Sequence, residues 1–151
     1  MKIAHGVAAG FAGLSLMIAA PASAGSMSQA EKLRRLDIML MVTGLRCRTG
    51  ADNFQAEYGR FTTNHLGELN AASDALKAQM GGGGRGAERA LDRLSVTMAN
   101  TYGQGHPWLD CRQLKQVARA LADARGTAPL VEAADQLLES RGTAQFAWLR
   151  R

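Results

Sequence analysis

The chain has 151 residues, a formal net charge of +5 at pH 7 and 46% hydrophobic residues. This length suits one domain with a single core. The mild basic excess falls short of the charge signature of nucleic-acid-binding domains, although it is compatible with weak attraction to an anionic lipid or cell-wall polymer.

The N-terminal segment has the pattern of a secretory signal peptide. An apolar run over residues 6–20 is followed by Pro21 and by small residues ending at Ala24. The pattern predicts that residues 1–24 are cleaved and that residues 25–151 form a single exported domain, periplasmic or secreted. The alternative is an uncleaved membrane anchor, but the run of about 15 residues is short for a membrane span. No later segment is long enough to cross a bilayer, so no transmembrane span is expected after cleavage.

Two cysteines, Cys47 and Cys111, remain after this cleavage. In an oxidising compartment two cysteines most often pair. The sequence therefore predicts a disulfide that closes a loop of about 65 residues. Two free thiols or a redox pair are the alternatives, and the redox pair is disfavoured because neither residue lies in a Cys-x-x-Cys motif.

The first predicted helix covers residues 29–45. Ser28 and Glu31 have the spacing of a capping box, and apolar residues recur at helical intervals from Leu33 to Gly44. A turn at Thr49-Gly50 ends this segment.

The longest apolar stripe follows, in a helix predicted from an N-cap at Asp52 to about residue 80. Gly59 and Gly67 each cost about 1 kcal/mol relative to alanine, so a bend or break near residues 62–67 would divide this helix in two. The stripe predicts the main wall of the core, with spacings of three and four: Phe54, Tyr58, Phe61, His65, Leu69, Ala72, Leu76 and Met80.

A glycine-rich segment at residues 81–86 predicts a flexible linker. A phosphate-binding loop is the alternative, but the segment lacks the Gly-Lys-Ser/Thr ending and no strand precedes it. Three further helices are predicted at 87–100, from 107–109 to about 123, and from 128 to about 140. The fold class is thus all-α, a small antiparallel bundle of four to six helices with one disulfide.

His65 and Glu68 lie one helical turn apart, a spacing that metal sites in helical bundles use. Such sites need further ligands from other helices, and the sequence identifies none. His65 also lies on the core stripe, where a hydrogen-bonded and partly buried histidine is the commoner role. No metal or other cofactor is predicted, with His65 and Glu68 as weak candidate ligands.

Three arginines flank the predicted disulfide: Arg46 and Arg48 on either side of Cys47, and Arg112 after Cys111. If the bridge forms, three guanidinium groups gather around one point and suit a carboxylate or phosphate. The alternative is that they pair with neighbouring carboxylates or solvent, or offset the carboxyl end of the first helix.

The segment from His106 to Asp110 contains the densest group of polar and aromatic residues. It could bind a ligand or partner, with Trp108 as the anchor. We favour the alternative, a helix start whose Trp108 covers the disulfide and whose Asp110 lies where an acid is favourable. Catalysis by Cys111 and His106 would need a free thiol, which the predicted disulfide excludes.

The C-terminal segment Phe146–Arg151 combines two aromatic residues with two arginines. This composition suits contact with a partner or a membrane surface. Packing of the segment against the bundle is the alternative.

A further observation concerns six segments of the chain: Arg34–Met41, Arg46–Arg48, Asn53–Gln55, Phe61, Asn64–Leu66 and Tyr102–Trp108. Together they resemble a group of small exported proteins of Gram-negative bacteria. The resemblance covers about residues 33–115 and implies no catalytic residue. Some similar chains carry the automatic name S-adenosyl-L-homocysteine hydrolase, but that family has a large two-domain fold with an NAD-binding Gly-x-Gly-x-x-Gly after a strand, and this chain has neither the strands nor the length.

These features predict an exported envelope protein that is not an enzyme and that binds a partner or an anionic envelope component. The alternative is a small hydrolase that acts through His65, Glu68, His106 and Asp110. Geometry separates the two hypotheses, because a shared metal shell requires His65 and His106 to lie within about 10 Å of each other.

Overall fold

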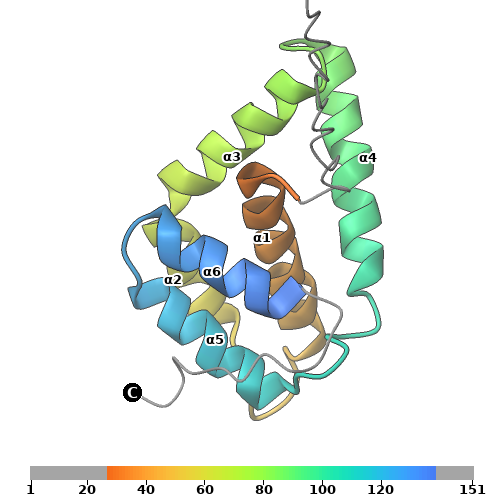
Figure 1. Cartoon of the computed structure of the whole chain (residues 1–151). Helices are drawn as coiled ribbons and strands as arrows, with labels where there is room; N and C mark the ends of the chain where they lie inside the picture. The colour runs from red at the N-terminus through yellow and green to blue at the C-terminus, as the bar shows by residue number, and fades with distance from the viewer. Residues whose placement is uncertain (1–26, 139–151) are drawn as a thin grey trace, which may run out of the picture.

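The computed structural model describes residues 27–138, so the predicted signal peptide and the segment Phe146–Arg151 lie outside the described residues. Within that range the chain forms six helices and no strand, which confirms the predicted all-α fold (Figure 1). None of these helices combines the length and the apolar character needed to cross a membrane. The helices are α1 (Gln29–Arg46), α2 (Gln55–Asn64), α3 (Leu66–Gln79), α4 (Arg85–Thr101), α5 (Cys111–Asp123) and α6 (Thr127–Leu138).

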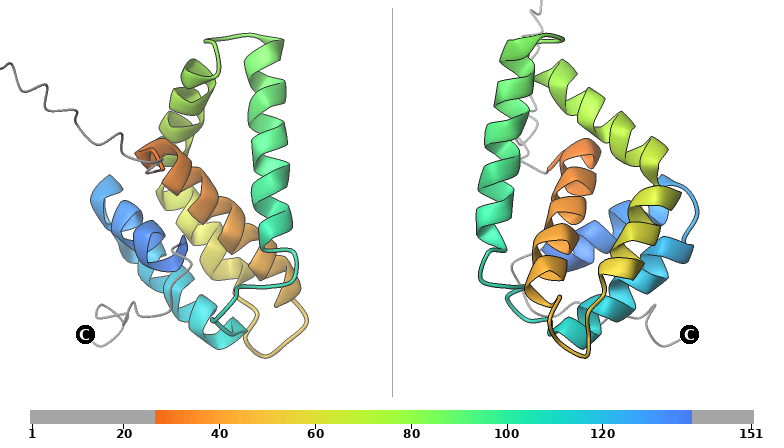
Figure 2. Two further views of the ribbon diagram at one scale, coloured as in Figure 1. Left: turned by 45° about the vertical axis from the view of Figure 1, so that its right-hand side comes forward. Right: turned by 180° about the vertical axis from the view of Figure 1, so that it is seen from behind.

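Helix α1 is the centre of the bundle and contacts all five other helices (Figure 2). Its N-terminus is capped by Ser28, whose hydroxyl accepts a hydrogen bond from the Glu31 amide at 3.1 Å. The buried positions are spread around the helix, as expected for a helix covered on several sides. They are Leu33, Leu36, Ile38, Met39, Leu40, Thr43 and Gly44.

The predicted long second helix is two helices, α2 and α3, which meet at His65. The break lies inside the predicted interval. The hydroxyls of Thr62 and Thr63 both donate to the Gly59 carbonyl, a type of bond that bends helices. Helix α2 also starts later than predicted, because the Asn53 side chain, and not that of Asp52, accepts from the first helical amide.

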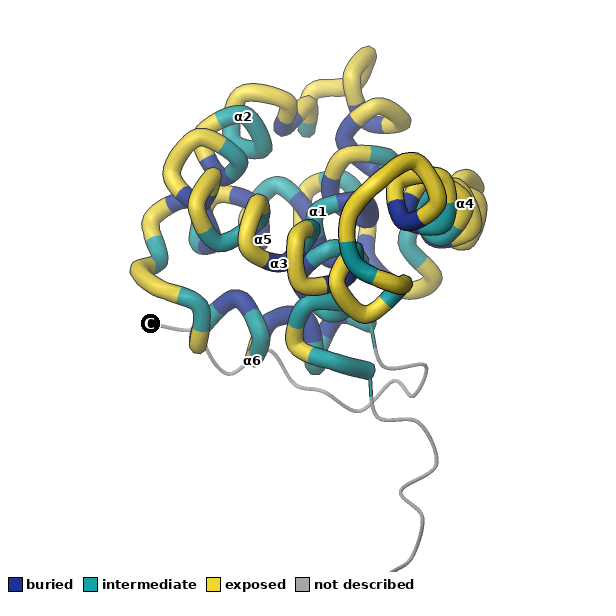
Figure 3. Tube along the Cα trace, turned by 90° about the horizontal axis from the view of Figure 1, so that it is seen from above, coloured by how far each residue is buried: buried dark blue, intermediate teal, exposed yellow. Residues whose placement is uncertain are grey.

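Helices α3 and α4 form a hairpin around a glycine turn. Gly81, Gly82 and Gly84 have φ values of 109°, 90° and 98°, which side chains other than glycine rarely adopt. The linker is shorter than predicted, since Arg85 and Gly86 already belong to α4. Most of α4 is exposed, because it packs only on α1 and α3 (Figure 3).

Two polar contacts hold α2 and α4 on α1. The Tyr58 hydroxyl donates to the Asp37 carboxylate at 2.9 Å, and the Arg34 guanidinium donates to the Ser95 hydroxyl at 3.1 and 3.2 Å. Burial raises the pKa of Asp37 and that of Tyr58. Helices α5 and α6 also pack on α1. The buried apolar residues of these helices form a single hydrophobic core.

A candidate binding cleft beside the disulfide

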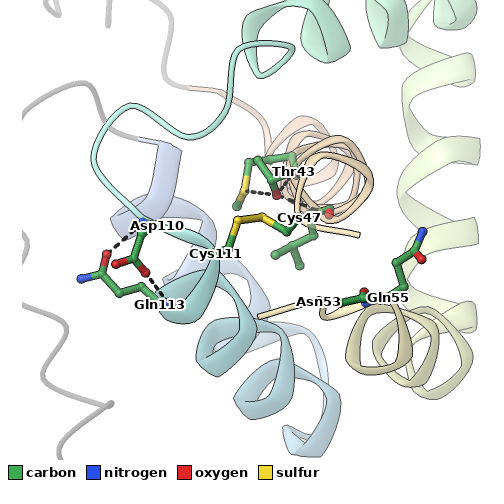
Figure 4. Close-up of a disulfide and its surroundings, with 9 residues drawn as sticks. Thr43, Cys47, Asn53, Gln55, Asp110, Cys111 and Gln113 are labelled. Carbon is green, nitrogen blue, oxygen red and sulfur yellow. Dashed lines mark hydrogen bonds between the residues drawn. A yellow bond between two sulfur atoms is a disulfide. The ribbon is translucent and has the colours of Figure 1, made fainter. Parts of the chain in front are cut away.

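Cys47 and Cys111 form a disulfide with a Cα–Cα distance of 5.7 Å, as predicted. Cys47 is the C-cap of α1, and Cys111 is the first residue of α5 (Figure 4). The bridge therefore joins the end of one helix to the start of another, 64 residues further along the chain. It leaves neither thiol available as a nucleophile.

Asp110 caps α5 immediately beside this bridge. Its Oδ1 accepts from the Gln113 amide at 2.8 Å, while the Gln113 side-chain oxygen accepts from the Asp110 amide at 3.0 Å (Figure 4). This capping box explains why α5 begins at Cys111 and not at residues 107–109. The spacing of Asp110 and Gln113 in the sequence could have located this start.

His106 is held by the main chain on both ring nitrogens. Its Nε2 lies 3.0 Å from the Leu137 carbonyl oxygen, which can only accept, so Nε2 carries the hydrogen. Its Nδ1 accepts from the Trp108 amide at 3.4 Å. The ring stacks on Tyr102 and contacts the edge of the Trp108 ring, with centroids 4.6 Å apart in the second pair. His106 therefore ties the loop to the end of α6.

A cleft of about 300 Å³ opens next to the disulfide. Both cysteines, Arg46, His106 and Asp110 line it, together with the apolar residues Leu109 and Leu114. The end of α1, the loop before α5 and the start of α5 form its walls, and the disulfide joins the two helix ends.

Only one of the three predicted arginines reaches this cleft. The Arg46 Nη1 donates to the Gly103 carbonyl at 2.9 Å. A Cβ added at Gly105 would lie 3.5 Å from the Arg46 Nε, and Gly105 has a φ of 107°, so this position favours glycine. Arg48 lines a second, more open hollow, which Arg46 also borders, and Arg112 does not line the cleft.

The alternative for these arginines, pairing with neighbouring carboxylates, is not observed within the described residues. Over residues 27–138, none of Arg46, Arg48 and Arg112 forms an ion pair. Trp108, the other predicted ligand contact, is 37% exposed and packs against His106.

His65 lies elsewhere and is only 2% exposed. Its Nε2 is 2.8 Å from the Leu121 carbonyl oxygen, and its Nδ1 is 3.7 Å from Glu68 Oε1, beyond hydrogen-bond range. No third histidine, cysteine or carboxylate in the described part of the chain joins this pair as a candidate metal ligand. His65 instead links the junction of α2 and α3 to α5.

The two histidines do not share a site. His65 contacts Leu121 in the last turn of α5, whereas His106 precedes the first residue of α5. Ten helical residues separate Cys111 from Leu121, which corresponds to about 15 Å. The two histidines therefore lie toward opposite ends of α5.

Comparison with protein-family models, curated proteins and solved structures finds no match to the chain. Fold and site define the protein as a small all-α domain with a disulfide-bordered cleft. Its function has to be inferred from the residues of that cleft.

The stability of the fold is expected to depend on the protonation of His106. Burial lowers the pKa of His106 below its usual value, so in mildly acidic solution the unfolded chain binds more protons than the folded chain. The stability from this residue is complete above about pH 6.5 and declines as the pH falls through the folded-state pKa. Urea unfolding between pH 8 and pH 5 measures it.

His106→Gln is the control for this pH dependence, since its amide can still donate to the Leu137 carbonyl but does not titrate. The free energy of unfolding of wild-type protein should fall more steeply toward pH 5 than that of His106→Gln. Parallel profiles would show that His106 protonation does not oppose folding.

Proposed function

We propose that this protein is an exported, non-enzymatic binding module whose cleft beside the disulfide holds an anionic group of an envelope component or partner. The main support is the position of Arg46, an exposed cation that lines this cleft and has no ion-pair partner within residues 27–138. A guanidinium group matches the planar geometry of carboxylates and phosphates.

The construction of the cleft favours binding. Its lining comes from the end of α1, the loop before α5 and the start of α5. The disulfide joins the two helix ends, and His106 ties the loop to α6, so little conformational entropy would be lost when a ligand binds. Its volume of about 300 Å³ is at the lower end of ligand pockets. That size suits one polar headgroup or the end of a peptide.

The same contacts argue against hydrolysis at this cleft. The two thiols are consumed by the disulfide, and both nitrogens of His106 are engaged by the main chain. A nucleophile and a free base within hydrogen-bond reach are the usual requirements of covalent catalysis. Binding is therefore the function that the residues of the cleft support better.

Export is part of the proposal because of the disulfide and the sequence of residues 1–24. Stable disulfides are typical of oxidising compartments outside the cytoplasm. The periplasm or the extracellular medium is the compartment that we propose.

The test uses the oxidised protein purified after export, with cell-wall polymer and anionic lipid vesicles as separate probes in a cosedimentation assay. We expect one probe to bind, and Arg46→Gln to weaken that binding about fivefold, the upper range for one exposed charge pair. Added salt should weaken binding of the wild type.

Arg48→Gln is the matched control, because it removes an equal charge next to Cys47 but outside the cleft. It should bind like the wild type. Equal loss in the two variants would indicate general charge attraction, and absence of binding to both probes would overturn the proposed function.

A further inference from the structure

Two opposite charges line the cleft. Arg46 is its cation and Asp110 its anion, and they do not form an ion pair with each other. A simple anion attracted by Arg46 would also meet the carboxylate of Asp110, and a simple cation would meet the guanidinium of Arg46. The charges of the cleft therefore favour a ligand that carries a cation beside its anionic group.

Hydrogen bonds hold both charged side chains in place. Arg46 uses Nη1 to bond the Gly103 carbonyl and keeps its other donors for a ligand. Asp110 uses Oδ1 as the α5 cap, while its Oδ2 has no hydrogen bond within the described range. Each group thus makes a hydrogen bond that positions it and, among the described residues, retains donors or acceptors for a ligand.

The other lining groups add no further charge. The pKa of His106 is lowered by burial, so its ring is neutral near pH 7, and its nitrogens are already engaged. The Thr43 hydroxyl donates to the Met39 carbonyl. The remaining lining is apolar or belongs to the disulfide and to the loop at Gln104 and Gly105.

We propose that the cleft binds a zwitterion, a small ligand that carries both a carboxylate and an ammonium group, as amino acids and short free peptides do. The carboxylate bonds Arg46 and the ammonium group bonds Oδ2 of Asp110. This assignment rests on the proposed function, which it deepens by defining the ligand class.

Three peptides that differ only in their end groups test the assignment by NMR titration of the oxidised, exported protein. The probes are alanyl-alanine, N-acetyl-alanyl-alanine without the ammonium group, and alanyl-alaninamide without the carboxylate. We expect alanyl-alanine to shift the amide resonances of Gly105 and Asp110. Each blocked peptide should bind about fivefold more weakly, since it loses one exposed charge pair.

Two variants assign the ends of the ligand. Asp110→Asn keeps a good N-cap but removes the charge, so it should bind the free and the acetylated peptide equally. Arg46→Gln should likewise bind the free peptide and the amide equally. Arg112→Gln, outside the cleft, should retain the preferences of the wild type.

The outcomes also separate this inference from the proposed function. Equal binding of N-acetyl-alanyl-alanine and alanyl-alanine to wild-type protein would overturn the zwitterion assignment and leave an anion site. If no peptide binds while cosedimentation still depends on Arg46, the ligand class is wrong and the binding function stands. Failure of both assays would overturn both.

Discussion

Replacing Cys47 and Cys111 together by alanine is expected to lower the free energy of unfolding by about 4 kcal/mol. The bridge closes a loop across 64 positions and so removes a large conformational entropy from the unfolded chain. A domain of this size has only about 5–15 kcal/mol of stability in total. Urea unfolding of the double variant beside oxidised wild-type protein measures the loss.

Reduced wild-type protein provides the control for this variant. Both lack the crosslink, so they should unfold at similar urea concentrations, and both should lose affinity for ligands of the cleft because α1 and α5 are no longer joined. A double variant as stable as oxidised protein would mean that packing alone holds these helix ends together.

Replacing Phe54 by alanine is expected to cost about 3–5 kcal/mol, the usual range for removing a buried aromatic ring. Phe54 is 0% exposed and precedes α2. A Cβ added at Gly44 of α1 would lie 3.3 Å from its ring, so the ring fills the space that this glycine leaves. The variant would leave a cavity between α1 and the start of α2, and chemical denaturation measures its cost.

Two control variants separate the cavity from other effects. Phe54→Leu keeps most of the volume and should cost less than about 1.5 kcal/mol. Leu66→Ala removes a side chain that is 59% exposed and should change stability by less than about 0.5 kcal/mol. Similar costs for Phe54→Ala and Leu66→Ala would contradict the central position of Phe54.

The sequence predicted the positions of the helices and their buried faces well wherever the pattern depended on residues close together in the chain. The apolar stripe that begins at Phe54 predicted buried positions at Phe61, Ala72 and Leu76, and all three are buried. The glycines in that stripe predicted the break at His65. Helix starts were less accurate, because they depend on side-chain bonds that several nearby residues could have made: Asn53 accepts from the first amide of α2, and Asp110 caps α5.

The candidate site was predicted only in part. The sequence placed Arg46, Arg48 and Arg112 together because each neighbours a cysteine, yet only Arg46 lines the cleft. Arg46 is the last residue of α1, whereas Arg48 lies in the turn after the C-cap Cys47. The rotation of α1 about its axis and the path of this turn decide which side chain reaches the cleft. The sequence predicted Asp110 as an acid at a helix start and, in the hydrolase alternative, as a catalytic residue. Its place beside Arg46 in one cleft emerged only from the fold.

The sequence by itself determined the helical class, the buried stripe and the single disulfide, because helical spacing is local and Cys47 had one available partner. The tertiary structure decided which charged residues share a cleft and how the histidines are used. Those outcomes depend on contacts between distant segments, such as His106 with Leu137 and His65 with Leu121. Such contacts arise only when helices pack, and no local pattern in the chain encodes them.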